Sequence, residues 1–202
     1  VVRPSRLSSN LGVTGAKNFG ANHAKFDWVV FMDSDDRFVP NIADDFLIEL
    51  ERLGNYDLIF FRCIDMNTKE LIGTIKDGYE LSFEELLNNG TPGECLPVVK
   101  KDAILQFPYP TELRCCESLA YKEMLYHGKK AYISDLVVRE YDASGDDRLS
   151  LFWSRTKRAN RLQEYFKKDL EYLKYMSIKN RLKTISRYFY YGLLRVVSLV
   201  IK

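Results

Sequence analysis

The chain has 202 residues, of which 46% are apolar and 29% are charged. This balance excludes a wholly disordered, collagen-like or low-complexity chain, and the length suffices for one well-buried domain with an appendage. The net charge of +2 hides an asymmetry, because residues 151–202 carry 13 Lys and Arg against 3 Asp and Glu. We therefore expect an acidic body over residues 1–150 and a basic, aromatic tail over residues 151–202, facing different partners.

Cysteine usage indicates a reduced compartment. The four cysteines are Cys63, Cys95, Cys115 and Cys116, and they show no Cys-x-x-Cys spacing. We also recognise no signal peptide before them. This pattern favours a cytoplasmic protein over a disulfide framework or a structural zinc site. The chain starts at Val1 without Met and enters a dense motif almost at once, so we expect further sequence upstream.

Predicted helices and strands alternate along the chain from its start. Small residues over 18–25 suit a helix, and residues 26–33 form an apolar run typical of a strand buried on both faces in the middle of a sheet. Pro40 is expected to begin a helix that runs to about Leu53. A second buried strand is predicted over Tyr56–Ile64.

The same alternation continues to residue 141. Ser82, followed by Glu85 three residues later, resembles a capping box that begins a short helix. The other expected elements are short strands over 71–75 and 97–101, a helix over 117–128, a strand over 131–141, and helices from Leu149 onward. This order predicts an α/β fold with a mixed sheet flanked by helices, and places the site beyond the carboxyl ends of the strands.

An acidic cluster, Asp33-Ser34-Asp35-Asp36, follows the first apolar run. Three carboxylates in four positions repel one another, and a divalent cation would offset that repulsion. In an extended segment Asp33 and Asp35 point the same way, so both can hold one Mg²⁺ or Mn²⁺ whose open positions take phosphate oxygens. The alternative is structural: Asp33 forms a turn and Asp36 caps the following helix.

Two enzyme families place Asp-x-Asp after an apolar strand. Haloacid-dehalogenase-like phosphohydrolases continue with a small pair such as Gly-Thr, whereas this chain continues with Arg37-Phe38. Residues 10–21, Asn-Leu-Gly-Val-Thr-Gly-Ala-Lys-Asn-Phe-Gly-Ala, resemble instead a segment of the family 2 glycosyltransferases. The apolar strand, the acidic cluster and Pro40 follow at that family's usual spacing, so the resemblance covers residues 10–40 and extends more loosely to about residue 150.

The resemblance implies a GT-A fold, a Rossmann-like nucleotide-diphospho-sugar transferase, with a C-terminal helical extension. It gives Asp33 and Asp35 the role of metal ligands for Mn²⁺ or Mg²⁺, with Asp33 also binding the nucleotide. The other residues that it assigns to donor or acceptor binding are Asn10, Gly12, Lys17 and Asp36. Lys17 stands where the family commonly has Arg, and a solvated helix lysine is the alternative.

The resemblance also implies a general base and a closing loop. Glu117 matches the family's acidic pair at a helix start, with Ser118 in place of the second acid. As base it would take the proton of the acceptor hydroxyl during an inverting attack; otherwise it complements the helix dipole. Arg148 and Ser150 are the expected residues that close over the diphosphate, with Arg139 as a second candidate.

We therefore expect a metal-dependent, inverting transferase of cell-surface polysaccharide synthesis, moving sugar from a nucleotide-sugar donor (a UDP-sugar) to a glycan or lipid-linked acceptor. The family's first strand and its Asp-Asp-Gly-Ser turn do not precede residue 10. That departure, with Ser118, keeps open a non-catalytic remnant or interaction module of the same fold. The phosphohydrolase is the third alternative.

The tail ends in a strongly apolar stretch over residues 188–201. Its 14 residues are fewer than the ~20 needed to span a bilayer, and Arg195 interrupts them. It suits a helix lying peripherally on the anionic inner face of a membrane, or a helix packed on the body. No nucleic-acid-binding module is recognisable, so nucleic acid is not an expected partner.

Overall fold

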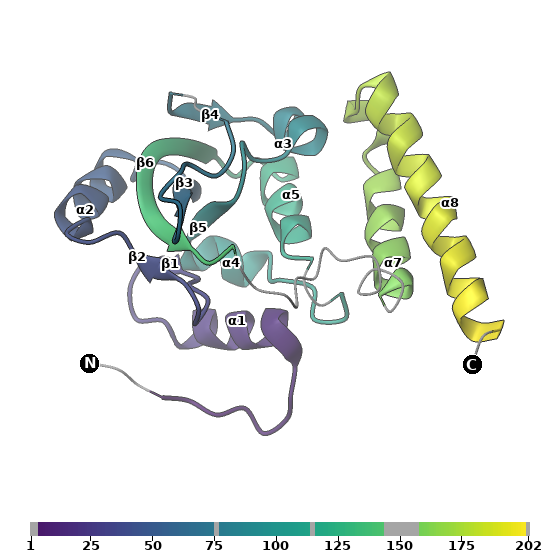
Figure 1. Ribbon diagram of the computed structural model, residues 1–202, viewed down its shortest axis with the longest axis horizontal. Coiled ribbons are helices and arrows are strands. Elements are labelled where there is room, and N and C mark those ends of the chain that lie inside the picture. The colour runs from purple at the N-terminus through teal and green to yellow at the C-terminus, as the bar shows by residue number, and fades with distance from the viewer. Residues whose placement is uncertain (1–3, 75–76, 114–115, 144–157, 201–202) are drawn as a thin grey trace.

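The computed structural model describes residues 4–74, 77–113, 116–143 and 158–200 (Figure 1). Within these ranges the chain folds into a curled mixed sheet with helices on both faces, and two further helices lie to one side. The strands are β1 (Trp28–Val30), β2 (Arg37–Phe38), β3 (Leu58–Asp65), β4 (Tyr79–Leu81), β5 (Cys95–Lys100) and β6 (Ala131–Tyr141). The helices are α1 (Gly12–His23), α2 (Ala43–Arg52), α3 (Phe83–Asn89), α4 (Lys101–Gln106), α5 (Ser118–Tyr126), α7 (Ala159–Leu170), the 3₁₀ turn η1 (Leu173–Tyr175) and α8 (Ile178–Val200).

The sheet is mixed, as the sequence predicts. Its strands follow the order β1-β5-β3-β6-β2, and β4 pairs with β6 beside this path. Strands β3 and β6 run parallel, whereas the other described pairs are antiparallel. Since β3 and β6 are neighbours near the centre, their carboxyl ends share one edge of the sheet.

Strand β3 is buried on both faces because its apolar residues alternate between two cores. Leu58 and Phe60 pack into the core shared with α1, α4 and α5, whereas Ile59 and Phe61 pack into the core under α2. All four side chains are at most 3% exposed. The prediction of a buried strand over residues 56–64 is confirmed, with the observed strand beginning and ending slightly later.

Strand β1 corrects the prediction of a strand in the middle of the sheet. It has three residues, lies at one end of the strand order, and among the described residues pairs with β5 alone. Its sides nevertheless contact both cores, Val29 in one and Trp28 and Val30 in the other. The run is therefore apolar because both faces are covered, which does not require a neighbour on each edge.

Most other predicted elements are confirmed, and the differences have local causes. Strand β6 has the predicted bounds, and Ser82 Oγ accepts a hydrogen bond from Glu85 N at the start of α3 (3.1 Å). Helix α2 begins at Ala43 rather than Pro40, because Asn41 has a φ of 61°, which ends helical geometry there. The short elements β2, β4 and α4 are absent from the sequence prediction, and over residues 71–74 only an isolated bridge at Leu71 is found.

The C-terminal helices form a separate small core that is tied to the body. Helices α7 and α8 run beside each other in opposite directions, with Phe166 and Tyr191 stacked between them (Figure 1). Tyr172, just before η1, packs edge-on against Phe83 and donates to Glu123 Oε1 (2.6 Å). The predicted helical tail is thus confirmed over the described residues 158–200, and it contacts α3 and α5.

Helix α8 also presents an apolar face to solvent. The side chains on that face are 57–75% exposed and recur at helical spacing: Ile178, Leu182, Phe189, Leu193 and Val196. In the described part of the chain, no helix combines the length and the hydropathy that crossing a membrane requires.

Candidate functional site

The acidic cluster forms a tight turn rather than an extended segment. Asp36 N donates to Asp33 O (3.2 Å), so Ser34 and Asp35 occupy the central turn positions between β1 and β2. Asp33, Ser34 and Asp35 are exposed, and all three line a cavity of about 950 Å³. The expected extended geometry is therefore wrong, but both predicted metal-binding carboxylates border the same cavity.

Lys17 lies between two acidic residues that are far apart in the sequence. Its Nζ is 3.6 Å from Asp33 Oδ1 and 3.3 Å from Glu117 Oε1, and its side chain is 20% exposed. The alternative of a freely solvated helix lysine is thus not what the structure shows. Three predicted site residues, from α1, from the acidic turn and from the start of α5, meet on one wall of the cavity.

The position of Lys17 follows from how α1 begins and where it is anchored. Asn10 Oδ1 accepts from Gly12 N (2.8 Å), and Gly12 has a φ of 72°, which glycine adopts without strain. Further along, the Asn18 side chain donates to Tyr109 O (2.8 Å) and accepts from Tyr109 N (3.0 Å). The nucleotide-binding roles of Asn10 and Gly12 stay predictions, whereas their part in starting the helix is visible.

Asp36 is turned away from the cavity wall that Asp33 and Asp35 form. Its side chain is 1% exposed; Oδ2 lies 3.0 Å from Arg139 Nη1, and Oδ1 accepts from Asp142 N (3.1 Å). Burial raises the pKa of Asp36, and the guanidinium of Arg139 opposes that shift. Both carboxylate oxygens are engaged, so the contact of Asp36 with substrate hydroxyls stays a prediction.

Arg139 of β6 joins the acidic turn to strands β3 and β5. Besides Asp36, its guanidinium donates to Glu94 Oε1 (2.9 Å), to Cys63 Sγ (3.1 Å) and to Cys95 O (3.3 Å). Its side chain is 3% exposed. Arg139 therefore fixes the base of the cavity, although it also lines it.

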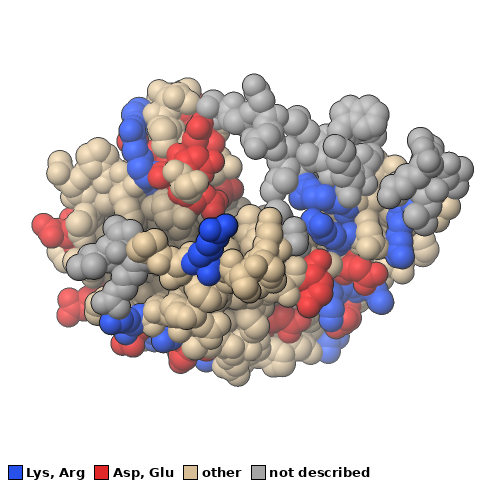
Figure 2. Space-filling model, turned by 90° about the horizontal axis from the view of Figure 1, so that it is seen from below, with Lys and Arg blue, Asp and Glu red and all other residues tan. Residues whose placement is uncertain are grey.

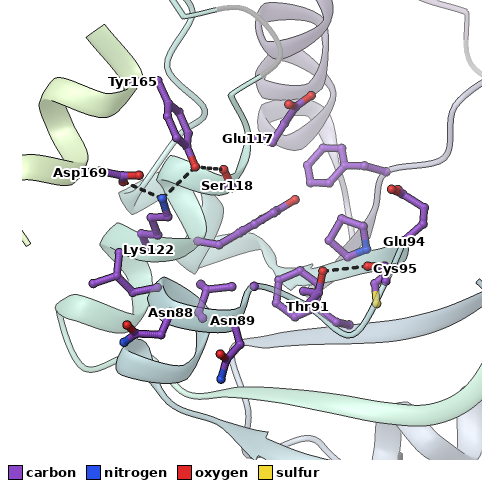
Figure 3. A pocket seen from close by; sticks show the side chains of 18 of the residues that line it. Asn88, Asn89, Thr91, Glu94, Cys95, Glu117, Ser118, Lys122, Tyr165 and Asp169 are labelled. Carbon is purple, nitrogen blue, oxygen red and sulfur yellow. Dashed lines mark hydrogen bonds and ion pairs between the residues drawn. The ribbon is translucent and has the colours of Figure 1, made fainter. Parts of the chain in front are cut away.

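The start of α5 is held by α7; the sequence analysis left open a C-terminal helix packed on the body but did not assign this contact. Ser118, which directly follows Glu117, has its Oγ 3.1 Å from Tyr165 OH of α7 (Figure 3). Lys122 donates to Tyr165 OH (2.8 Å) and to Asp169 Oδ1 (2.6 Å). Burial by itself lowers the pKa of Lys122, but Tyr165 and Asp169 more than offset this and raise the pKa overall.

This network makes the tail one wall of the cavity. Lining side chains from α7 and α8 include Tyr165, Asp169, Lys183 and Arg187. Sequence analysis treated the same residues only as part of a basic, aromatic tail. The spacing of four residues within each pair signals one face of α7 and one face of α8, but not which surface each face meets.

The remaining predicted residues have no structural description. Arg148 and Ser150 lie outside the described residues. Across the described ranges, no group of three or more Asp, Glu, His or Cys residues could hold a metal ion. The role of Asp33 and Asp35 as metal ligands stays a prediction; two exposed carboxylates are compatible with the way Mg²⁺ is held when phosphate oxygens and water complete its shell.

Sequence comparison finds one family and one curated relative. Residues 1–95 match the family described as Glycosyl transferase family 2. A protein of Haemophilus influenzae (strain ATCC 51907 / DSM 11121 / KW20 / Rd) described as an uncharacterized glycosyltransferase is 30% identical over 105 residues. That match covers 50% of this chain and 36% of the relative, so it spans about a third of the relative's length.

Solved structures of TarS from S. aureus share the fold. A complex of TarS 1-349 with UDP is 14% identical, covers 91% of this chain and 71% of the solved one, and has a TM-score of 0.56. Another TarS structure is 14% identical and has a TM-score of 0.58. The match covers 91% of this chain and 43% of the TarS chain. At this identity the likeness concerns the fold, which is the predicted GT-A α/β fold.

The buried ion pair between α5 and α7 leads to a stability prediction. Lys122 and Asp169 are 8% and 7% exposed, so Asp169→Ala leaves an ammonium buried without its carboxylate. We expect a loss of about 3–5 kcal/mol in the free energy of unfolding, measured by urea denaturation. The control is Glu164→Ala, whose exposed pair with Lys167 (3.7 Å) should contribute less than about 1 kcal/mol. Equal losses in the two variants would contradict the prediction.

Proposed function

We propose that this chain is a member of glycosyl transferase family 2, whose model matches residues 1–95, and that it transfers a sugar from a UDP-sugar to a hydroxyl of a glycan or lipid-linked acceptor, with inversion. The observation that carries the proposal is the convergence of Lys17, Asp33 and Glu117 on one cavity wall. A metal-binding carboxylate and a candidate base beside one cavity are the parts that such a transfer needs. Synthesis of a cell-surface polysaccharide is the role that we propose for it.

The acidic turn would hold the divalent cation. Asp33 and Asp35 are exposed carboxylates on the cavity wall, and hard oxygen ligands of this kind suit Mn²⁺ or Mg²⁺. The cation, when bound, neutralises charge on the diphosphate leaving group. Lys17 adds a fixed positive charge next to Asp33, which reduces the repulsion between the acids and offers a donor to a phosphate oxygen.

Glu117 would act as the base. During transfer, the acceptor oxygen forms a bond to the anomeric carbon while the bond from that carbon to the diphosphate oxygen breaks. The electron pair leaves with the nucleoside diphosphate, and the acceptor's proton passes to a Glu117 carboxylate oxygen. Attack from the face opposite the leaving group inverts the anomeric configuration. Lys17, 3.3 Å away, holds the Glu117 carboxylate on the cavity wall.

The other assigned residues complete the proposal. Asn10 and Gly12 begin the helix that carries Lys17, so changes there would act on the donor through Lys17. We propose that Arg148 and Ser150 close over the diphosphate and exclude water. Asp36 would position the acidic turn through its contact with Arg139, in addition to any contact with sugar hydroxyls.

The first test concerns the metal and the nucleotide. Asp35→Ala should weaken binding of UDP in the presence of Mn²⁺ by at least about tenfold, because even indirect support of a metal ligand is worth 10–100-fold. Titration calorimetry of UDP with and without Mn²⁺ measures this. Asp45→Ala is the matched control, since Asp45 is exposed on α2 away from the cavity. If Mn²⁺ does not change UDP affinity in the unaltered chain, the proposed metal site is refuted.

The second test concerns the base. Glu117→Gln should lower the rate of UDP release from UDP-glucose or UDP-N-acetylglucosamine by about 10²–10⁴-fold and leave UDP affinity within about twofold. Glu84→Gln, an exposed residue of α3, is the control. Full turnover in Glu117→Gln would remove Glu117 from the mechanism. A chain that binds UDP but releases none from any donor would be the non-catalytic form of the fold, and release of inorganic phosphate from simple esters would indicate the phosphohydrolase.

The third test concerns the outer face of α8, which we propose lies against an anionic membrane. Exposed apolar side chains cover that face, and residues 178–200 contain Lys and Arg but no Asp or Glu. Phe189→Ser with Leu193→Ser should abolish co-sedimentation with phosphatidylglycerol vesicles. Leu47→Ser with Ile48→Ser on α2 is the control, because those side chains are equally exposed. Equal binding to pure phosphatidylcholine vesicles, or no effect of the α8 variant, would contradict the contact.

A further inference from the structure

Helix α8 presents a polar face to the cavity, opposite its apolar outer face. The residues of α8 that line the cavity are Asn180, Lys183, Thr184 and Arg187. They follow one another at spacings of three, one and three residues, so they share one side of the helix. Lys183 and Arg187 are four residues apart and therefore place an ammonium and a guanidinium next to each other on the cavity wall.

Among the described residues, neither of these two cations forms an ion pair. Burial raises the pKa of Asp169 and Arg187 is near enough to oppose that rise, but Asp169 is already paired with Lys122. Lys17 pairs with Glu117 and Asp33, Lys122 pairs with Asp169, and Arg139 pairs with Asp36 and Glu94. Within the ranges that the structure describes, no acidic oxygen lies within 4.0 Å of Lys183 or Arg187. The wall that α8 contributes therefore carries surplus positive charge, while the acidic turn carries surplus negative charge.

The basic wall is held in place. Asn180 Nδ2 donates to Asn88 O (2.8 Å) and Asn88 Oδ1 (3.0 Å), and Ser177 N donates to Asn88 Oδ1 (2.7 Å). These bonds join the start of α8 to the end of α3, where Asn88 lines the cavity (Figure 3). The guanidinium carbon of Arg187 lies 5.5 Å from the centre of the Phe166 ring, which keeps it on the α7 side.

The two charged regions lie at different ends of the molecule. The acidic turn lies between β1 and β2 in the body, and α8 lies beyond α5 and α7 (Figure 1). In the view from below, acidic side chains gather on the body side of the hollowed middle and basic ones gather over the C-terminal helices (Figure 2). If the donor diphosphate binds with a cation at the acidic turn, the part of the cavity beside α8 remains free for the second substrate, the acceptor.

We propose that Lys183 and Arg187 form a binding subsite for a phosphate group carried by the acceptor. A guanidinium offers two parallel N–H groups to phosphate oxygens, and an adjacent ammonium adds a point charge. This proposal rests on the proposed transferase function, and it specifies that the acceptor carries a phosphate group. The phosphate could belong to a water-soluble glycan or to a lipid carrier, since either presents the same oxygens.

The test measures phosphate binding while UDP and Mn²⁺ occupy the proposed donor site. Unaltered protein is saturated with UDP and Mn²⁺, and inorganic phosphate or glucose 6-phosphate is then titrated while the backbone amide signals of α8 are followed by NMR. Lys183→Ala with Arg187→Ala should weaken this binding at least about tenfold, as expected for loss of charge-assisted hydrogen bonds. UDP affinity should change less than about twofold.

A matched control separates a subsite from general positive charge. Lys167→Ala with Lys179→Ala removes two cations from the same helices, and neither lines the cavity. Equal weakening in both double variants would overturn the subsite. A loss of UDP affinity in Lys183→Ala with Arg187→Ala would show that the pair holds the donor and would also overturn it.

Vesicles distinguish the source of the phosphate. Phosphatidylcholine vesicles containing phosphatidic acid should compete with glucose 6-phosphate if the carrier is a lipid, and should not compete if the acceptor is a soluble glycan phosphate. If UDP fails to bind even to the unaltered chain, the proposed transferase function fails. The phosphate titration without UDP then still decides the subsite by comparing the same two double variants.

Discussion

The ammonium of Lys17 joins three parts of the chain at the cavity. Asp33 follows the first strand, Glu117 precedes α5, and Lys17 comes from α1, and the Lys17 ammonium contacts both acidic side chains. Opposite charges hold the two acidic residues closer than their mutual repulsion would allow. The anchoring of α1 to the Tyr109 backbone by Asn18 keeps the ammonium in place. The proposed donor and base functions both depend on this arrangement.

The C-terminal helices belong to the same site rather than to a separate appendage. Tyr165 and Asp169 contact the first turn and a half of α5, directly after Glu117. Because the Lys122–Asp169 pair is buried, removing either partner while the helices stay packed on the body would leave a buried charge without its counter-ion. This coupling means that a change in α7 can shift the proposed base without touching it.

Acidic and basic side chains of the cavity lie on different parts of the fold. Acidic residues gather where strands end, as expected for a cation and diphosphate site, and the lining cations that form no ion pair with a described residue, Lys183 and Arg187, come from α8. The same helix has an apolar face outward, so one element can serve a membrane and an anionic acceptor at once. The two proposals for α8 concern opposite faces and can be tested separately.

The sequence by itself determined the alternation of helices and strands and the place of the acidic cluster after an apolar run, and its resemblance to a known family suggested Lys17, Asp33 and Glu117 as candidate site residues. It could do so because burial on both faces makes β3 apolar over most of its length, and because motif spacing is local along the chain. Only the tertiary structure decided that Asp36 turns inward to Arg139, that β1 lies at the end of the strand order, and that Tyr165, Asp169, Lys183 and Arg187 face the cavity. These facts depend on contacts between residues 43 to 106 positions apart, and the helical spacing of a charged residue does not say which surface it will meet.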